Sequence, residues 1–266
     1  MKTIVVANQK GGVGKTTVAR HLVWHGVEKG LRVLAVDMDV QGNFSTTFKN
    51  MEDDNGYKTA REASGITSNH LVASGLFDAA NKNLPALCAE RLSYVEADSG
   101  IVNVERRDLQ EVIEAGQSRF AELANDFDVC VLDTGPAVSN LLIVALSVGD
   151  FAVSPCKPDR DALAGLAGFF SNVMRVRDET GINPKLAQLG VLPNQINKTR
   201  AYHRSVLADM RQAWGAAVLP VELYERAAID MAKDKPVWRT ERGESSSQAA
   251  QEMKGVCAHI YKRMGL

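Results

Sequence analysis

The sequence predicts an α/β fold: a single domain in which a mostly parallel, twisted sheet is covered by helices on both faces. Short apolar runs rich in Val, Ile and Leu alternate with longer helical patterns along the 266 residues. Such alternation is typical of βαβ units, whose strands run parallel. The runs are apolar at nearly every position, which is expected of strands that are covered on both sides.

The elements follow one another along the chain in a regular order. The predicted strands are 3–7, 32–36, 92–96, 128–132, 150–154 and 186–192, with a weaker candidate at 216–219. The predicted helices are 16–29, 103–125, 138–147, 160–179, 202–214, 224–233 and 246–264. Region 44–91 has no clear period, and its polar stretch MEDDNGYKTAREASG (51–65) predicts a mobile surface segment.

The last predicted helix carries a small apolar face. Its apolar residues at helical spacing are Ala249, Met253, Val256, Ile260 and Met264. Insertion into a membrane surface is driven by bulkier residues such as Trp, Phe and Leu. We therefore expect this helix to pack against the domain, with no membrane partner.

Charge and cysteine content limit the classes of protein to which the chain can belong. The net charge of −1 argues neither for nor against nucleic acid, so DNA binding requires a local basic patch. The four cysteines are scattered without a C-x-x-C pair, which is typical of a reduced, cytoplasmic protein. The chain opens directly on a strand, so we expect neither a signal peptide nor an N-terminal helix-turn-helix domain.

Residues 8–17, NQKGGVGKTT, lie between a predicted strand and a predicted helix. This is the context of a phosphate-binding P-loop, in which glycines let backbone N–H groups face the phosphates. The predicted nucleotide-binding residues of the loop are Gly11, Gly12, Val13, Gly14, Lys15, Thr16 and Thr17. Lys15 is expected to reach the β- and γ-phosphates, and the Thr16 hydroxyl to hold Mg²⁺. Lys10 stands where the common motif has its first glycine, and it adds a second lysine.

Acidic residues follow two further predicted strands. Asp37 and Asp39 end the second strand, and Asp133 ends the apolar run VCVL in the Walker B arrangement, where a carboxylate holds Mg²⁺. Ligands of parallel sheets bind at the carboxyl ends of the strands. The P-loop and these acids are therefore expected to converge on one crevice.

The motifs KGGVGKTT, DMDVQGN and VLDTGP together resemble the ParA/Soj branch of the ParA–MinD family of deviant Walker A ATPases. The resemblance continues through 154–166, 190–200 and 236–253. It implies ATP and Mg²⁺ as cofactors and a homodimer formed around two ATP molecules. It also implies that Lys10 reaches the partner's nucleotide, that Asp39 positions the attacking water and that Asp37 supports the Mg²⁺ shell.

The same resemblance also implies which residues contact the α-phosphate and the base of the nucleotide. Thr17 is expected at the α-phosphate, Asn194 at the adenine edge and Pro220 beside the base. It also implies nonspecific binding to double-stranded DNA and a ParB-like partner. The candidate DNA contacts are Lys198, Arg200, Arg204, Arg226, Lys233 and Lys254. Acids are interleaved among these basic residues, so a solvated surface is the competing interpretation.

Three departures from the family pattern lie near the crevice. Val40 replaces the usual proline, Gly135 replaces the first of two prolines after Walker B, and segment 137–144 (AVSNLLIV) replaces a small and polar run. None of them removes a phosphate or Mg²⁺ ligand.

For some of these residues, a purely structural role is the alternative interpretation. Asp37 can be a buried structural acid, and Asn194 can simply terminate its strand. His21 and His25 lie one helical turn apart, but Leu22 occupies the place of the zincin glutamate, so we expect a plain helix surface.

The favoured function is an ATP-dependent partitioning ATPase, found in the cytoplasm and on the nucleoid when it is bound to ATP. The alternatives are a MinD-like membrane-cycling ATPase, a microcompartment-positioning ParA-type ATPase, an iron–sulfur ATPase of the nitrogenase-iron-protein type and a non-hydrolysing scaffold.

Overall fold

The computed structural model describes residues 1–54, 70–136, 139–240 and 244–266, and a seven-stranded sheet lies at its centre. The strand order is β3-β4-β2-β5-β1-β6-β7, and every adjacent pair is parallel except β3 and β4. The strands are β1 (Lys2–Val6), β2 (Val33–Met38), β3 (Ala86–Ala89), β4 (Leu92–Val95), β5 (Val129–Thr134), β6 (Phe151–Cys156) and β7 (Ala187–Pro193). The predicted fold class is confirmed.

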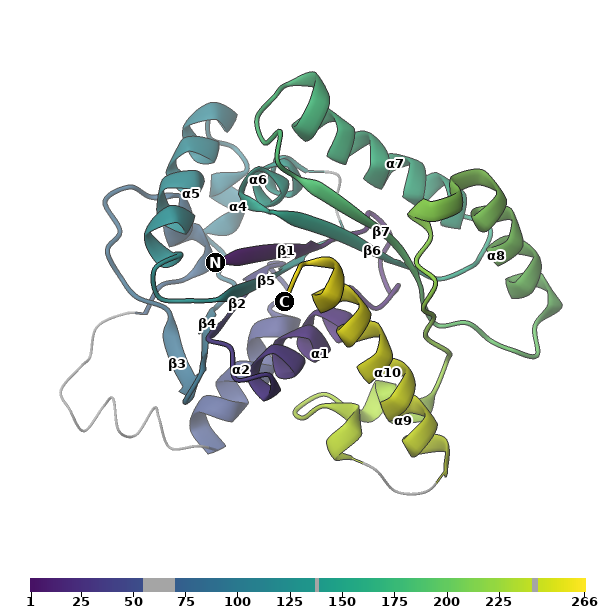
Figure 1. The fold of residues 1–266 in the computed structure, drawn as a ribbon. Coiled ribbons are helices and arrows are strands. Elements are labelled where there is room, and N and C mark those ends of the chain that lie inside the picture. Colours follow the sequence, from purple (N-terminus) through teal and green to yellow (C-terminus); the bar gives the residue numbers. More distant parts are fainter. Residues whose placement is uncertain (55–69, 137–138, 241–243) are drawn as a thin grey trace.

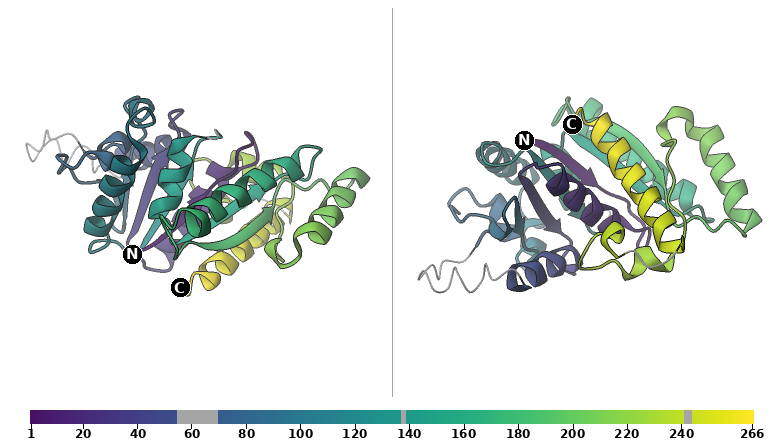
Figure 2. Two further views of the ribbon diagram at one scale, coloured as in Figure 1. Left: turned by 90° about the horizontal axis from the view of Figure 1, so that it is seen from above. Right: turned by 60° about the horizontal axis from the view of Figure 1, so that its bottom comes forward.

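Helices cover the sheet in two layers (Figures 1 and 2). One layer contains α1 (Lys15–Glu28), α2 (Asn43–Asp54), α9 (Ala227–Met231) and α10 (Glu244–Arg263). The other contains α4 (Ile101–Val104), α5 (Leu109–Leu123), α6 (Asn140–Val148) and α7 (Ala162–Met174), while α8 (Ala201–Trp214) lies beyond β7. Alternate residues of β1 serve the two cores: Ile4 and Val6 face the first layer, and Val5 and Ala7 face the second.

Four short turns of helix connect these elements. They are η1 (Ala73–Phe77), the π-helical η2 (Arg175–Glu179), η3 (Gly215–Ala217) and η4 (Val237–Arg239). The weak strand predicted at 216–219 is wrong, because η3 occupies its first half and only an isolated bridge joins Val218 to Val191 of β7. The helix predicted at 160–179 is α7 continued by the wider π turn of η2.

Region 44–91, which has no clear period in the sequence, begins with a helix that includes residues 51–54 of the stretch predicted to be mobile. Residues 43–54 form α2, whose Phe44 and Phe48 are one turn apart and buried. Ser and Thr between these aromatic residues dilute the helical pattern, while burial of the two rings stabilises the helix by several kcal/mol, about 1.5–3 for each side chain. Residues 55–65 of the polar stretch lie outside the described part.

The helix predicted at 103–125 is two helices. The first ends at Val104, and Asp108 caps the second, because its carboxylate accepts a hydrogen bond from the backbone N–H of Glu111 at 3.1 Å. An N-cap carboxylate begins a new helix because it satisfies a backbone donor of the first turn.

The terminal helix packs against the domain as predicted. Its five apolar residues named above are at most 1% exposed. The Tyr261 hydroxyl donates to the carbonyl oxygen of Leu22 at 2.8 Å, and a Cβ at Gly26 would lie 2.3 Å from that hydroxyl. Helices α1 and α10 therefore approach closely only because position 26 is glycine. Among the described residues, no helix combines the length and the apolar character that crossing a bilayer requires.

Candidate nucleotide-binding site

The P-loop leaves β1 and enters α1 through two glycines in left-handed backbone conformations. Gly12 has φ +72° and Gly14 has φ +89°, values that favour glycine. A Cβ at Gly14 would also lie 2.3 Å from Nδ2 of Asn194. Glycine at position 14 is thus required both by the backbone and by its neighbour.

The loop forms a cavity of about 300 Å³ at the N-terminus of α1. Its lining combines the P-loop with residues from three other segments: Gly11, Gly12, Gly14, Lys15, Thr16, Thr17, Asp39, Asn43, Pro136 and Gln195. A helix N-terminus offers free N–H groups and a positive dipole end, which suit a phosphate. The structure therefore brings the P-loop, Asp39 and the segment after Asp133 to one cavity.

Lys15 is held inside this cavity. Its side chain is almost buried, and its ammonium donates to the carbonyl oxygen of Lys10 at 3.2 Å. Burial lowers the pKa of Lys15, and the nearby carboxylates of Asp133 and Asp39 oppose that effect. A bound phosphate supplies the negative charge that this desolvated ammonium lacks.

Thr16 and Asp133 form the part of the site that suits Mg²⁺. The Thr16 hydroxyl donates to Oδ2 of Asp133 at 2.7 Å, whereas the buried Oδ1 has no hydrogen-bond partner among the described residues. Burial, followed by the charge of Asp37, raises the pKa of Asp133 to about 8. An unpaired carboxylate oxygen beside a hydroxyl fits Mg²⁺, which takes oxygen ligands from one or two side chains and the substrate's phosphates.

Asp37 is a buried acid that organises the neighbouring backbone. Oδ1 accepts from the N–H of Asp39 at 3.0 Å, and Oδ2 accepts from the N–H and the hydroxyl of Ser45, both at 2.7 Å. Burial raises the pKa of Asp37, while the hydrogen bonds from Ser45 oppose that rise. These contacts favour the interpretation of Asp37 as a structural acid, because its two carboxylate oxygens accept hydrogen bonds from the start of α2 and from the Asp39 turn.

Asp39 lies where the phosphate cavity opens. Its carboxylate accepts the N–H of Gln41 at 3.1 Å, and the side chain lines the cavity opposite the P-loop residues. A half-buried carboxylate at this position can accept a proton from, or orient, a water molecule beside the terminal phosphate.

A second cavity of about 230 Å³ continues the groove past Gly14, Thr17 and Gln195, which line both cavities. Asn194, at the end of β7, lines it and donates from Nδ2 to the carbonyl oxygen of Val13 at 2.7 Å. Asn194 therefore braces the P-loop from the base side of the groove. Pro220 is exposed and lies outside the described lining of both cavities.

Gln195 and Tyr224 are among the lining residues of this second cavity that sequence reasoning missed. Gln195 follows Asn194 directly and has a positive φ of 53°, which is unusual for a residue other than glycine. Tyr224 also lines the cavity, and it belongs to no motif that could have indicated it. In the sequence, Gln195 could have been found only through its position next to Asn194, and no such signal indicated Tyr224.

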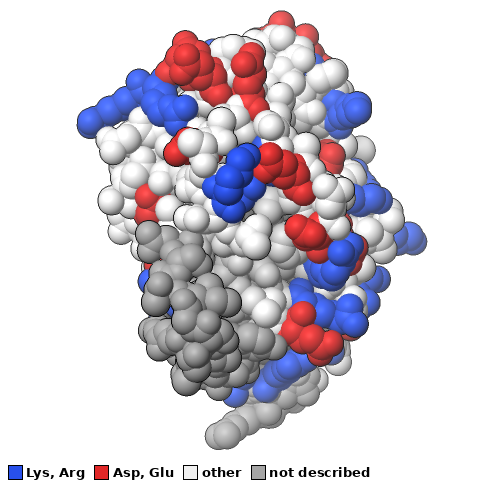
Figure 3. All heavy atoms as spheres, turned by 90° about the vertical axis from the view of Figure 1, so that its left-hand side faces the viewer, with Lys and Arg blue, Asp and Glu red and all other residues white. Residues whose placement is uncertain are grey.

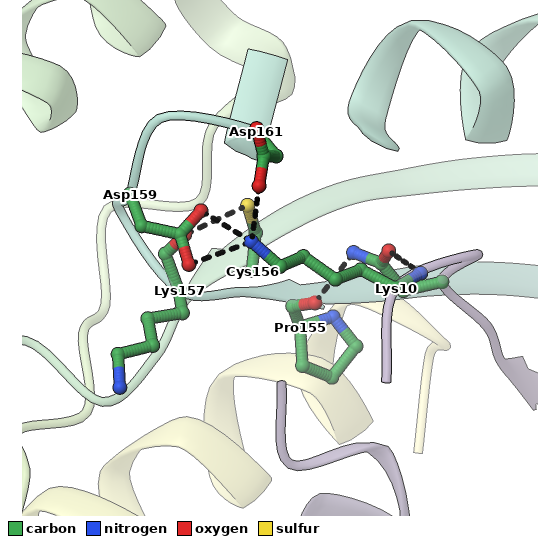
Figure 4. Close-up of polar contacts among 7 residues, drawn as sticks. Lys10, Pro155, Cys156, Lys157, Asp159 and Asp161 are labelled. Atoms are coloured by element: carbon green, nitrogen blue, oxygen red, sulfur yellow. Dashed lines mark hydrogen bonds and ion pairs between the residues drawn. The ribbon is translucent and has the colours of Figure 1, made fainter. Parts of the chain in front are cut away.

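The Lys10 side chain extends toward Asp159 and Asp161 (Figure 4), and it lies outside the described lining of the phosphate cavity. Its ammonium lies 2.7 Å from both carboxylate oxygens of Asp159 and 3.5 Å from Oδ2 of Asp161. Burial lowers the pKa of Lys10, but the hydrogen bonds and charges of these two acids outweigh that effect and raise it above its usual value. Both acids follow β6, and sequence reasoning did not single them out.

The prediction that His21 lies on a plain helix surface is wrong. His21 is fully buried; its Nδ1 lies 2.7 Å from the carbonyl oxygen of Thr17, and its Nε2 accepts the N–H of Val237 at 3.1 Å. Burial lowers its pKa to about 4. The ring is thus a neutral brace between α1 and the segment before α10, and His25 packs against Trp238 and Tyr261.

The candidate DNA contacts differ in how much they are engaged within the chain. Arg226 forms an ion pair with Glu252 at 2.6 Å, and Lys198 lies 3.9 Å above the centre of the Tyr224 ring. Arg200 and Arg204 are exposed at the start of α8, and Lys233 and Lys254 are exposed as well. On the face seen around β3 and α5, positive and negative side chains are mixed (Figure 3).

Comparisons with known proteins agree with this geometry. A family model described as an AAA domain matches residues 1–188. Protein IncC from Escherichia coli is 30% identical over 266 residues, which covers 99% of this chain and 70% of the relative. The chain belongs to the ParA/Soj-type ATPases.

Other relatives of this ATPase fit the same family. The chromosome-partitioning ATPase Soj from Thermus thermophilus is 26% identical over 99% of the chain and 94% of the relative. A plasmid partition protein from Borrelia burgdorferi has the same fold, with a TM-score of 0.72, 18% identity and 98% of each chain covered. The ATPase is therefore of the ParA-type positioning class.

Proposed function

We propose that this chain is an ATP-dependent DNA-partitioning ATPase. ATP with Mg²⁺ drives two copies into a nucleotide-sandwich dimer that binds double-stranded DNA nonspecifically. A ParB-like partner stimulates hydrolysis and thereby releases the dimer, so that a plasmid, chromosome or other cargo is positioned. The names of the relatives support partitioning, and the site described above supports the nucleotide chemistry.

The described side chains divide the work of hydrolysis. The backbone from Gly11 to Gly14 and the N-terminus of α1 hold the phosphates, and the Lys15 ammonium balances their charge. Thr16 and Asp133 hold Mg²⁺, which neutralises charge on the phosphates when it is bound. Thr17 and Asn194 lie along the groove toward the α-phosphate and the base.

Asp39 orients the attacking water for an in-line displacement at the γ-phosphate. The carboxylate accepts a hydrogen bond from that water, and the water's oxygen forms a bond to phosphorus as the bond to the leaving ADP oxygen breaks. Asp37 keeps Asp39 in place by accepting its backbone N–H at 3.0 Å. We therefore expect Asp39→Ala to bind ATP and to lose most hydrolysis.

The position of Lys10 is the observation that carries the dimer. Its ammonium is held by Asp159 (Figure 4), outside the described lining of its own phosphate cavity. A cation in that place is available to a second copy docked over the groove, where the partner's Lys10 would balance charge on the transferred phosphoryl group.

Light scattering and phosphate release test this proposal in one set of samples. Wild type should become dimeric with ATP and Mg²⁺, and Lys10→Ala should bind ATP yet lose productive hydrolysis as a dimer. Lys185→Ala is a matched control, because Lys185 is an exposed lysine remote in sequence from these motifs. Substantial turnover by a monomer that Lys10→Ala leaves unchanged would contradict the sandwich dimer.

Co-sedimentation separates DNA from lipid as the surface that the dimer binds. The apolar face of α10 is buried against the domain, so it is not free to insert into a membrane. This favours DNA over a membrane as the surface that the dimer binds. With ATP, the protein should pellet with DNA and stay in solution with anionic liposomes. Phosphate contacts by exposed residues such as Lys198, Arg200 and Lys233 predict that DNA binding weakens steeply with salt, whereas Arg226 would first have to leave Glu252.

A further inference from the structure

Arg20 lies on α1, one helical turn after Thr16, and has no part in the hydrolysis steps described above. Its guanidinium donates from Nη2 to the carbonyl oxygen of Asn43, the first residue of α2. Asn43 lines the phosphate cavity, and so does Asp39, which lies four residues before it. Arg20 therefore joins the helix that follows the P-loop to the segment that carries Asp39.

The Arg20 guanidinium is a half-buried cation without a direct ionic partner. It forms no ion pair with a described residue, and its buried Nε has no hydrogen-bond partner among them. Burial lowers the pKa of Arg20, and three nearby carboxylates oppose that effect, those of Asp133, Asp234 and Asp37. A partly desolvated cation beside the carboxylates of a cleft is typical of a functional position.

The segment from Asp39 to Asn43 is held at both of its ends. At its start, the N–H of Asp39 donates to Oδ1 of Asp37 at 3.0 Å. The chain then forms a tight turn, in which the N–H of Gly42 donates to the carbonyl oxygen of Asp39 at 2.8 Å. At its end, Arg20 holds the carbonyl oxygen of Asn43. The place of the Asp39 carboxylate therefore depends on both attachments.

The two attachments come from different parts of the site. Asp37 belongs to β2, whereas Arg20 belongs to the helix whose first turn carries Lys15 and Thr16. Through Arg20, the start of α2 is fixed relative to the residues that face the phosphates. A displacement of about 1 Å of a group that orients a reactant can lower a rate about 100-fold. The contact from Arg20 thus bears directly on the distance between Asp39 and the terminal phosphate.

We propose that Arg20 is a positioning residue for ATP hydrolysis: it ties the start of α2 to α1 and so holds Asp39 where its carboxylate orients the attacking water. This role rests on the function proposed above, because Arg20 acts through Asp39. Arg20 lies outside the described lining of both cavities along the groove, so we expect it to affect the rate of hydrolysis and not the binding of ATP.

Arg20→Met tests this role, because it removes the charge and the donor while it keeps a long side chain. Phosphate release at saturating ATP should fall about tenfold, as expected for the loss of a charged hydrogen bond. The affinity for a non-hydrolysable ATP analogue with Mg²⁺, measured by isothermal titration, should change by less than about twofold. Arg20→Lys keeps a cation and a donor, and its rate should return to within about threefold of wild type.

Arg91→Met is the matched control for this variant. Arg91 also donates to a backbone carbonyl oxygen, that of Gly30 just after the other end of α1, at 3.2 Å. It lies outside the described lining of both cavities along the groove. Its removal should therefore leave both the rate of phosphate release and the affinity for the analogue as in wild type.

The same change in a variant without the Asp39 carboxylate separates positioning from a general structural effect. In Asp39→Ala there is no carboxylate to place, so adding Arg20→Met should leave the residual single-turnover rate unchanged. A change that only disturbed the fold would lower the rate in both backgrounds. Where Arg20→Met does not fold, Arg20→Gln takes its place in every measurement.

Three results would overturn the role of Arg20. The first is a wild-type rate in Arg20→Met, and if Asp39→Ala is inactive in the same assay, the proposed function still stands. The second is a loss of affinity for the analogue as large as the loss of rate, which would assign Arg20 to nucleotide binding. The third is an equal loss of rate in both backgrounds. A wild-type rate in Asp39→Ala would instead contradict the proposed function, and the role of Arg20 would fall with it.

Discussion

The two ends of the P-loop hold their lysines in opposite ways. Lys15 is almost buried, at the first turn of α1, and its ammonium contacts a backbone carbonyl oxygen. Lys10 lies at the rim, about 30% exposed, and is paired with carboxylates of the segment after β6. One cation is fixed in its place before any ligand arrives, and the other is held by partners that it can exchange.

This difference follows from what surrounds each end. The inner end is braced by Asn194 on the loop and by His21 and Tyr261 on α1, all of them buried. The outer end is braced by an ion pair that is open to water, and such pairs contribute little, about 0–1 kcal/mol. A rigid inner end suits binding, and a weakly held outer end suits a switch.

The largest expected effect is at the inner end. Lys15→Ala removes the desolvated cation from the phosphate cavity, so the affinity for ATP should fall about 10- to 100-fold, as expected for a charged hydrogen bond. Isothermal titration with Mg²⁺-ATP measures it, with Lys185→Ala as control. An unchanged affinity would mean that Lys15 is no more engaged with phosphate than Lys10.

The His21 brace predicts that stability depends on pH. Its folded pKa of about 4 lies below the unfolded value of about 6.5, so the unfolded state binds the extra proton first. Full stability is present above about pH 6.5, and about 3 kcal/mol is lost as the pH falls toward 4. Urea unfolding of wild type and His21→Gln between pH 7.5 and 5 should show a smaller decrease in the variant, and parallel decreases would exclude this brace.

Asn194→Ala tests the brace on the loop itself. The change leaves the Val13 carbonyl oxygen without its buried donor, which costs about 1–3 kcal/mol of unfolding free energy. Thermal unfolding measures the loss. Asn172→Ala is a comparison, because that amide bonds the carbonyl of Gly168 within α7 and is only partly buried. A variant with full stability and weak ATP binding would instead favour the predicted contact with adenine.

The smallest effect on stability is expected at the outer end. Asp159→Asn weakens the pair with Lys10 and should change the unfolding free energy by less than about 1 kcal/mol. Because it releases the ammonium, ATP-dependent dimerisation should strengthen modestly, by up to about fivefold. Sedimentation equilibrium measures this, and a weakened dimer would show that Asp159 helps to place Lys10 rather than to restrain it.

The contacts of Asp133 and Lys10 show what could be predicted from the sequence. The fold and the convergence of the P-loop with Asp39 follow from strand order, since carboxyl ends of parallel strands share one edge. Thr16 and Asp133 were expected in one crevice for the same reason, and the hydrogen bond between them was seen only in the structure. The pairing of Lys10 with Asp159 was not, because it depends on how the segment after β6 turns back, and no local pattern encodes that turn.

Burial was the other property that the sequence left open. Phe44 and Phe48 lie in a stretch of polar residues, and His21 lies on a helix whose pattern identifies no buried polar residue. In each case, a contact with a distant segment decides whether the side chain is buried: Phe48 packs against Tyr94 of β4, Phe44 packs against Phe48, and the His21 imidazole accepts the N–H of Val237. Long-range packing overrides weak local signals of this kind.

The crossing of α1 and α10 also has a consequence for how the protein is made. The helix that carries Lys15 leaves the ribosome more than 200 residues before the helix that packs against it, because α1 ends at Glu28 and α10 begins at Glu244. Until residues 244–263 emerge, Leu22 and its neighbours on α1 remain open to water or to chaperones. A nascent chain of this protein therefore completes the packing around α1 only once α10 has emerged from the ribosome.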